Sequence, residues 1–64
     1  EVIKMYQIKV FYKNEWEMLA MFSYDVSTDI IIDTAIAIAN DPTIAQENIA
    51  VVDMVDDEVL WHLC

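Results

Sequence analysis

Residues 56–58, Asp-Asp-Glu, form the densest cluster of metal-ligating side chains in this 64-residue chain. Carboxylate oxygens bind Ca²⁺, but a calcium site needs six or more oxygens and usually a glycine to turn its loop. The chain contains no glycine. We therefore interpret residues 56–58 as a solvated turn, and we predict neither a metal site nor a cofactor.

His62 and Cys64 are the single histidine and the single cysteine, too few for a zinc site. Their spacing places them on one strand face, where a nucleophilic pair would need them, but at the frayed end of the chain. We favour an ordinary histidine. Pairs of carboxylates are unavoidable in a chain with 12 acidic residues, and phosphate-cradling glycine loops are absent. We predict no catalytic residues and no enzymatic activity.

The charge of the chain is strongly asymmetric along the sequence. All three lysines lie in the first 13 residues, whereas residues 14–64 carry 11 carboxylates and neither lysine nor arginine, for a formal net charge of −9. Direct binding to nucleic acid is disfavoured, because it requires cations that displace counterions from phosphates. A compact polyanion can instead occupy a protein groove built for nucleic acid. The alternative is acidity that serves only solubility.

The length indicates one domain, residues 1–64. A domain this small buries only about 60% of the surface of its unfolded chain. Because 58% of the residues are hydrophobic, some apolar surface must stay exposed or be covered by a partner. The longest apolar runs, residues 18–22 and 35–39, are far below the ~20 residues of a membrane span. With one cysteine and no signal-peptide pattern, we expect a soluble, intracellular protein.

Residues 2–12 and 16–24 predict two strands joined by a hairpin, in which Asn14 is best suited to positive φ. In the first strand one face is expected to hold Tyr6, Ile8, Val10 and Tyr12, and the other Gln7, Lys9 and Phe11. In the second strand one face is expected to hold Met18, Ala20 and Phe22, and the other Glu17, Leu19, Met21 and Ser23.

Residues 25–41 predict a helix with Ser27 as its N-cap and Asp29 in its first turn. The inward arc at 100° per residue holds Thr28, Ile31, Ile32, Ala35, Ile36, Ile38 and Ala39. The outer side holds Asp33, Thr34, Asn40 and Asp41, together with Ile30 and Ala37. Pro42 ends the helix, and Asp41 could cap a further turn that starts at Pro42.

Residues 49–55 and 59–64 predict two further strands around the turn at 56–58. The order is ββαββ. The expected fold class is therefore α+β, an antiparallel sheet with one helix packed across one face.

Three short motifs resemble the T-even phage antitoxin Dmd family: Glu1-Val2-Ile3-Lys4, Tyr12-Lys13-Asn14-Glu15 and Val55-Asp56-Asp57. The resemblance implies one helix on a small antiparallel sheet and a phage protein that silences a bacterial RNase toxin of the RNase LS type in the cytoplasm of the infected host. In that family a helix tryptophan and an asparagine near the helix end contact the toxin. The asparagine matches Asn40, or Asp41 with a one-residue shift. The tryptophan position falls at Ile32 or Ile31, and neither is aromatic.

We therefore predict an antitoxin that docks an acidic surface in the RNA-binding cleft of a bacterial RNase. The predicted partner-binding residues are Ile30, Ile32, Asp33, Asn40, Asp41, Asp56 and Asp57. Two alternatives remain open: a DNA-mimic inhibitor of a DNA-processing or CRISPR protein, and a self-associating structural module.

Overall fold

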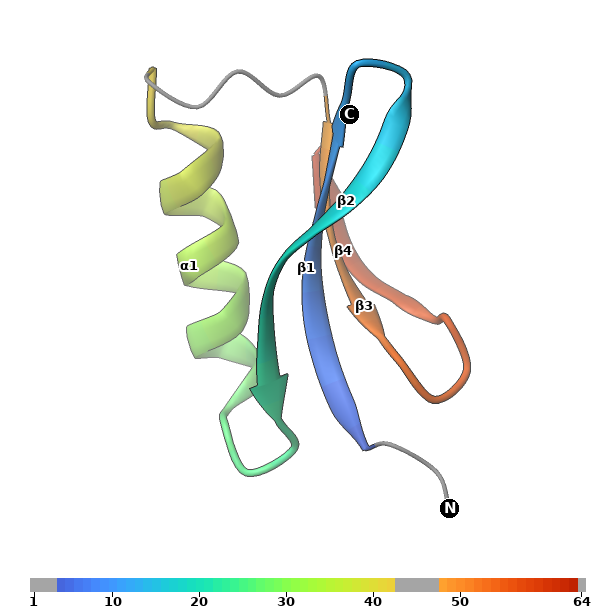
Figure 1. Cartoon of the computed structure of the whole chain (residues 1–64). Coiled ribbons are helices and arrows are strands. Elements are labelled where there is room, and N and C mark those ends of the chain that lie inside the picture. The colour runs from blue at the N-terminus through green and yellow to red at the C-terminus, as the bar shows by residue number, and fades with distance from the viewer. Residues whose placement is uncertain (1–3, 43–47, 64) are drawn as a thin grey trace.

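The structure, a computed structural model, describes residues 4–42 and 48–63. Its elements are β1 (Met5–Tyr12), β2 (Glu15–Ser23), α1 (Thr28–Ala39), β3 (Asn48–Asp53) and β4 (Val59–Leu63) (Figure 1). The strands form one antiparallel sheet in the order β2-β1-β3-β4, so that β2 and β4 are its edges. The predicted α+β fold of ββαββ order is confirmed.

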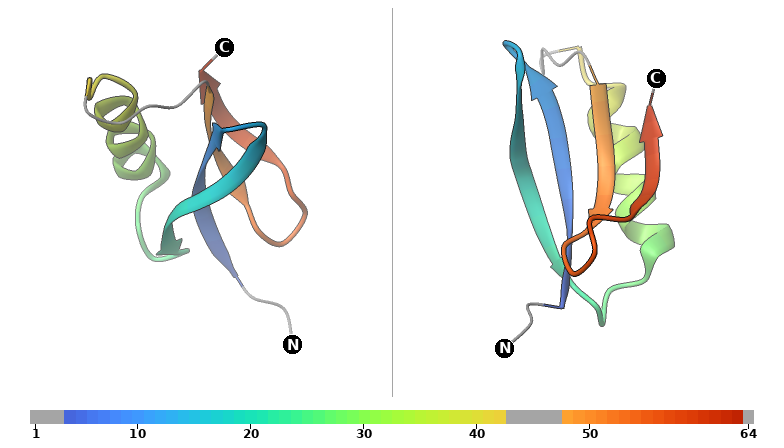
Figure 2. Two further views of the ribbon diagram at one scale, coloured as in Figure 1. Left: turned by 45° about the horizontal axis from the view of Figure 1, so that its top comes forward. Right: turned by 90° about the vertical axis from the view of Figure 1, so that its right-hand side faces the viewer.

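Helix α1 covers one face of the sheet, and no described element covers the other, which we call the open face (Figure 2). The alternation predicted for β1 decides which side chains meet the helix. Ile8 and Val10 are buried beneath α1, whereas Lys9 lies between them on the open face. The buried core consists of Ile8, Val10, Ile31, Ala35, Ile49 and Val51.

The β1–β2 hairpin has a two-residue loop, because Tyr12 pairs directly with Glu15. Asn14 has the predicted positive φ, 68°, and Lys13 has one as well, 53°. Two successive residues in the left-handed region are the signature of the type I′ turn, whose twist matches that of the flanking strands. The turn therefore sets the register of the hairpin without a glycine.

The faces predicted for β2 are wrong at one end, because a β-bulge interrupts the strand. Ile8 pairs with Ala20, but the next residue of β1, Lys9, pairs with Met18, which leaves Leu19 as the extra residue. An extra residue reverses the alternation on one side of the bulge. Met18 therefore shares the open face with Lys9, while Ala20 faces the core as predicted.

Helix α1 begins as the sequence predicts. The Ser27 hydroxyl oxygen accepts a hydrogen bond from the Asp29 N–H (3.3 Å), which satisfies one of the free donors of the first turn. The helix ends at Ala39, with Asn40 as its C-cap, so it stops three residues before Pro42. The predicted turn after Pro42 lies outside the described residues. The helix has 12 residues, too few to cross a membrane, and the described ranges hold no longer one.

The core face of α1 is narrower than predicted. Ile31 and Ala35 are fully buried, but Ile36, placed in the inward arc by its periodicity, is 39% exposed. Ile36 lies at the edge of the arc, and a single helix on a twisted sheet touches it along only a narrow line. Ile30, predicted to face outward, is 58% exposed, and Ala37 is exposed as well.

The β3–β4 connection is held by local hydrogen bonds. Strand β3 ends at Asp53, two residues earlier than predicted. The Asp53 N–H donates to the Glu58 carbonyl oxygen (2.9 Å). Within the turn, Asp56 Oδ1 accepts from the Glu58 N–H (3.0 Å), and Asp57 has a positive φ of 58°. Aspartate tolerates this conformation better than most residues. The acidic turn therefore has a defined shape.

Candidate functional site

Negative charge is concentrated at one end of the molecule, which we call the acidic end. The β2–α1 connection and the β3–β4 turn both lie there, at the bottom of Figure 1. The acidic end contains the carboxylates of Asp25, Asp29, Asp53, Asp56, Asp57 and Glu58. These are six of the ten carboxylates on described residues. Two turns far apart in the sequence thus build one negative surface.

A side-chain hydrogen bond joins the two turns. The Tyr24 hydroxyl donates to Asp53 Oδ1 (2.7 Å), and the same oxygen accepts from the Val55 N–H (2.9 Å). The Tyr24 ring also packs on the Tyr6 ring, with centroids 4.7 Å apart. Asp53 therefore anchors both the β3–β4 turn and the segment that enters α1.

The pKa of Tyr24 reports the negative environment of the acidic end. The hydrogen bond to Asp53, followed by desolvation and the charges of Asp53 and Asp56, raises the pKa of this phenol from 10.0 to about 12. Each cause favours the protonated form, because a carboxylate disfavours a second negative charge beside it and desolvation disfavours any charge.

The described lysines lie apart from one another. Lys4 immediately precedes β1 at the acidic end, where it brings the formal charge from the −6 of the six carboxylates to −5. Lys9 lies on the open face, and Lys13 occupies the β1–β2 turn at the opposite end, with its Nζ 5.2 Å from the centre of the Tyr12 ring. The acidic end is therefore only partly compensated.

The predicted partner-binding residues on α1 fall into two groups. Ile30, Asp33 and Asn40 are exposed. Ile32 is half-buried and packs against the core, and Asp41 is half-buried at the end of the helix. Only the first group presents an accessible surface on the helix, and it contains one carboxylate.

The structure does not bring Asn40 and Asp41 together with Asp56 and Asp57. Helix α1 starts at the acidic end and runs to the opposite end, so its last residues lie far along the molecule from the β3–β4 turn (Figure 1). The sequence reasoning missed Asp25, Asp29 and Asp53 as members of the site. Their positions, before α1, in its first turn and at the end of β3, were visible, but the strand order that brings these segments to one end was not.

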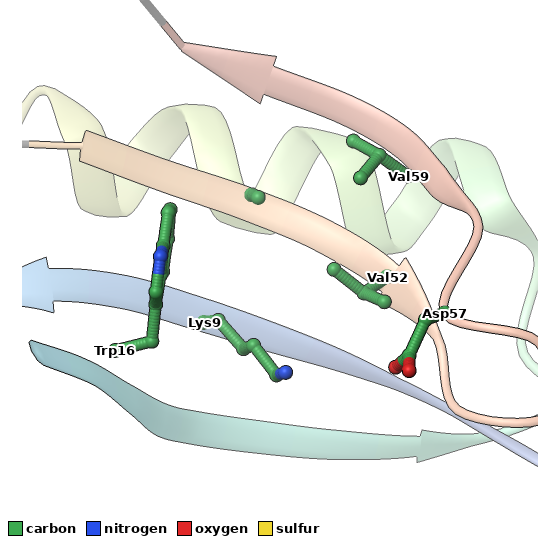
Figure 3. Close-up of a pocket in the computed structure, with 6 residues that line it drawn as sticks. Lys9, Trp16, Val52, Asp57 and Val59 are labelled. Atoms are coloured by element: carbon green, nitrogen blue, oxygen red, sulfur yellow. The ribbon is translucent and has the colours of Figure 1, made fainter.

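An open groove lies on the open face, beside the acidic end. It has a volume of about 290 Å³ and is lined by Lys9, Trp16, Ala50, Val52, Asp57 and Val59 (Figure 3). Ala50 and Val52 are buried at its floor, and the Lys9 side chain on β1 extends toward Asp57, which comes from the β3–β4 turn. Asp57 thus belongs to both the acidic end and the groove.

No protein-family model, curated protein or solved structure matches this chain. The site must be interpreted from its own geometry. Among residues 4–42 and 48–63, no three metal-ligating side chains lie close enough to hold an ion. His62 is exposed on β4, opposite Ala50, and Cys64 lies outside the described residues. What the site offers chemically is a shaped array of carboxylates, which suits electrostatic recognition of a cationic surface.

Proposed function

We propose that this chain is a phage-type antitoxin that binds and inhibits a bacterial RNase toxin by placing its acidic end in the RNA-binding cleft. The observation that carries the proposal is the set of six carboxylates in and next to two turns that the Tyr24–Asp53 hydrogen bond joins. The resemblance of its turn motifs to the Dmd family supports the choice of an RNase as the target. The protein would act in the cytoplasm of the infected host.

The mechanism is competition for the cleft. An RNA-binding cleft is lined with cations that neutralise phosphates, and carboxylates at the acidic end satisfy the same cations. Opposite charge accelerates the encounter, whereas apolar contacts determine how long the complex lasts. Because the turns are held by hydrogen bonds, little ordering entropy is lost on docking.

Two matched triple variants test where the inhibitor docks. The first, Asp25→Asn with Asp56→Asn and Glu58→Gln, removes three charges from the acidic end. The second, Glu15→Gln with Glu17→Gln and Asp33→Asn, removes three charges from elsewhere. RNA cleavage by an RNase LS-type toxin is measured with increasing amounts of each protein. We expect the first variant to inhibit at least about tenfold more weakly, because each lost close charge pair weakens association.

The second variant serves as the control and should change inhibition by less than about threefold, since distant charges are screened. Equal losses in the two variants would mean that only net charge matters. A larger loss in the second would move the docking surface to α1 and β2. Parallel assays with a DNA glycosylase and a CRISPR effector distinguish the DNA-mimic alternative: inhibition of either, with the RNase unaffected, would overturn the antitoxin proposal.

A further inference from the structure

The open face differs from the rest of the molecule in having no net charge. Residues paired directly across antiparallel strands share a face, so the register places Met18 and Ala50 beside Lys9, and His62 beside Ala50. Among the described residues, the charged groups on this face are Lys9 and, at its rim, Asp57. In a chain of formal charge −9, a neutral face requires an explanation.

The same face exposes large apolar side chains. Trp16, Met18, Met21 and Val59 are each between 44% and 55% exposed. Trp16 and Val59 line the groove, whose floor is made by Ala50 and Val52 (Figure 3). Met18 lies beside Lys9 and Met21 beside Gln7 on the same face. Tryptophan and methionine are enriched at the centres of protein interfaces, from which charged residues are depleted.

The charges decide between a basic partner and a second copy of the chain. A surface that recognises a basic protein is expected to be acidic, as the acidic end is, and the open face is not. Two copies at −9 repel each other wherever their acidic surfaces meet, so a contact between copies requires a neutral face. The open face meets this requirement.

We propose that the open face is the interface of a homodimer. In a two-fold contact every interaction occurs twice, with the roles of the two residues exchanged. Lys9 and Asp57 line one groove, and in the described structure neither forms a salt bridge. Lys9 of each copy pairs with Asp57 of the other, while Trp16 and Val59 pack across the interface. The acidic end apart from Asp57 extends beyond the contact.

The available area is sufficient for such a contact. A stable interface buries roughly 800 Å² on each partner, about a fifth of the 4394 Å² accessible surface of this chain. One whole face of the sheet can supply that share. Packing two sheets face to face would also cover the apolar side chains that a 64-residue domain cannot bury alone.

The first test compares Val59→Glu with Ile30→Glu by sedimentation equilibrium. Both substitutions place a carboxylate on an exposed apolar residue, one on the open face and one on α1. We expect the native chain to dimerise between about 10 µM and 1 mM, Val59→Glu to weaken the dimer at least about tenfold, and Ile30→Glu to change it little. A native chain that stays at 7.4 kDa throughout, or a dimer lost only in Ile30→Glu, would overturn the proposal.

The second test uses a charge exchange that only a two-fold contact can satisfy. In a dimer of Lys9→Glu alone, a carboxylate at position 9 would face the Asp57 carboxylate of the other copy at both pairs. In a dimer of Asp57→Lys alone, an ammonium group at position 57 would face the Lys9 ammonium group of the other copy at both pairs. Each variant should therefore be monomeric where the native chain is dimeric.

If each pair joins position 9 of one copy to position 57 of the other, an equal mixture of the two variants can form a dimer with opposite charges at both pairs. One pair is the native one, and in the other the two charges are exchanged between the positions. Position 9 of the Lys9→Glu copy then meets the new lysine of its partner, and position 57 of the Lys9→Glu copy, still an aspartate, meets the native Lys9 of the Asp57→Lys copy. Circular dichroism first confirms that each variant is folded. Recovery of the dimer on mixing supports the proposal, and two monomeric species in the mixture contradict it.

Discussion

At the scale of single residues, the Tyr24–Asp53 hydrogen bond is the contact that fixes the acidic end. The two residues are 29 positions apart in sequence, and the bond joins the start of the helix connection to the end of β3. No sequence pattern marks a long-range pair of this kind, because neither residue type nor spacing indicates that Tyr24 and Asp53 meet. The sequence could suggest an acidic turn at residues 56–58, but not the second turn beside it.

This hydrogen bond gives the stability of the fold a dependence on high pH. The folded pKa of Tyr24, about 12, lies above its ordinary value of 10.0, so the folded state favours the protonated phenol. The stabilisation is fully present below pH 10 and is lost as the pH rises toward 12. We expect urea midpoints to fall over this interval, and Tyr24→Phe to remove part of that fall. Tyr12→Phe, which removes a hydroxyl elsewhere, is the control; identical pH profiles for both variants would contradict the assignment.

At the scale of elements, α1 is held to the sheet by very few side chains. Ile31 and Ala35 are its fully buried residues, and no other helix among the described residues supports it. An isolated helix of 12 residues is marginal in water, so the packing of Ile31 must supply much of its stability. The neighbouring Ile30 has the same side chain and is 58% exposed.

The adjacent isoleucines therefore form a matched pair for mutagenesis. We expect Ile31→Ala to lower the free energy of unfolding by about 2–5 kcal/mol, the usual cost of truncating a buried isoleucine. For so small a domain this is enough to leave much of the protein unfolded at 37 °C. Ile30→Ala should change stability by less than about 0.5 kcal/mol, since alanine is the better helix former and no packing is lost. Chemical denaturation measures both, and equal effects would show that α1 does not pack as described.

The sequence predicted the helix, strands and turns better than it predicted which face of a strand each side chain occupies. The cap at Ser27, the turn at Asn14 and the alternation of β1 follow from local chemistry, and all three are confirmed. Leu19 shows where local reasoning fails: a bulge adds one residue without a glycine to mark it, and it moves Met18 to the open face. Because the groove depends on that register and on the strand order, only parts of the candidate site could be foreseen.

At the scale of the whole molecule, charge separates two surfaces with opposite electrostatic roles. The acidic end carries six of the ten described carboxylates, and the open face carries no net charge. Every lysine lies in the first 13 residues of the sequence. The fold separates them, with Lys4 at the acidic end, Lys9 on the open face and Lys13 in the β1–β2 turn at the opposite end. A single net charge of −9 thus describes neither surface.

These two roles predict opposite effects of salt on the two proposed associations. Binding to a basic cleft joins opposite charges, so raising the salt from ~50 to ~300 mM should slow association roughly tenfold or more. Self-association brings together two chains of −9, and the same salt should strengthen it. The two Lys9–Asp57 pairs oppose this trend, but exposed ion pairs contribute at most about 1 kcal/mol each and salt weakens them only in part.

Stopped-flow mixing with the RNase and sedimentation equilibrium of the chain alone measure the two associations independently. The same sign of salt dependence in both would mean that one of the two surfaces has been misassigned. An RNase on-rate that salt does not change would remove the acidic end from the mechanism. A dimer that weakens steeply with salt would place the ion pairs, rather than the apolar side chains around Trp16 and Val59, at the centre of the contact between copies.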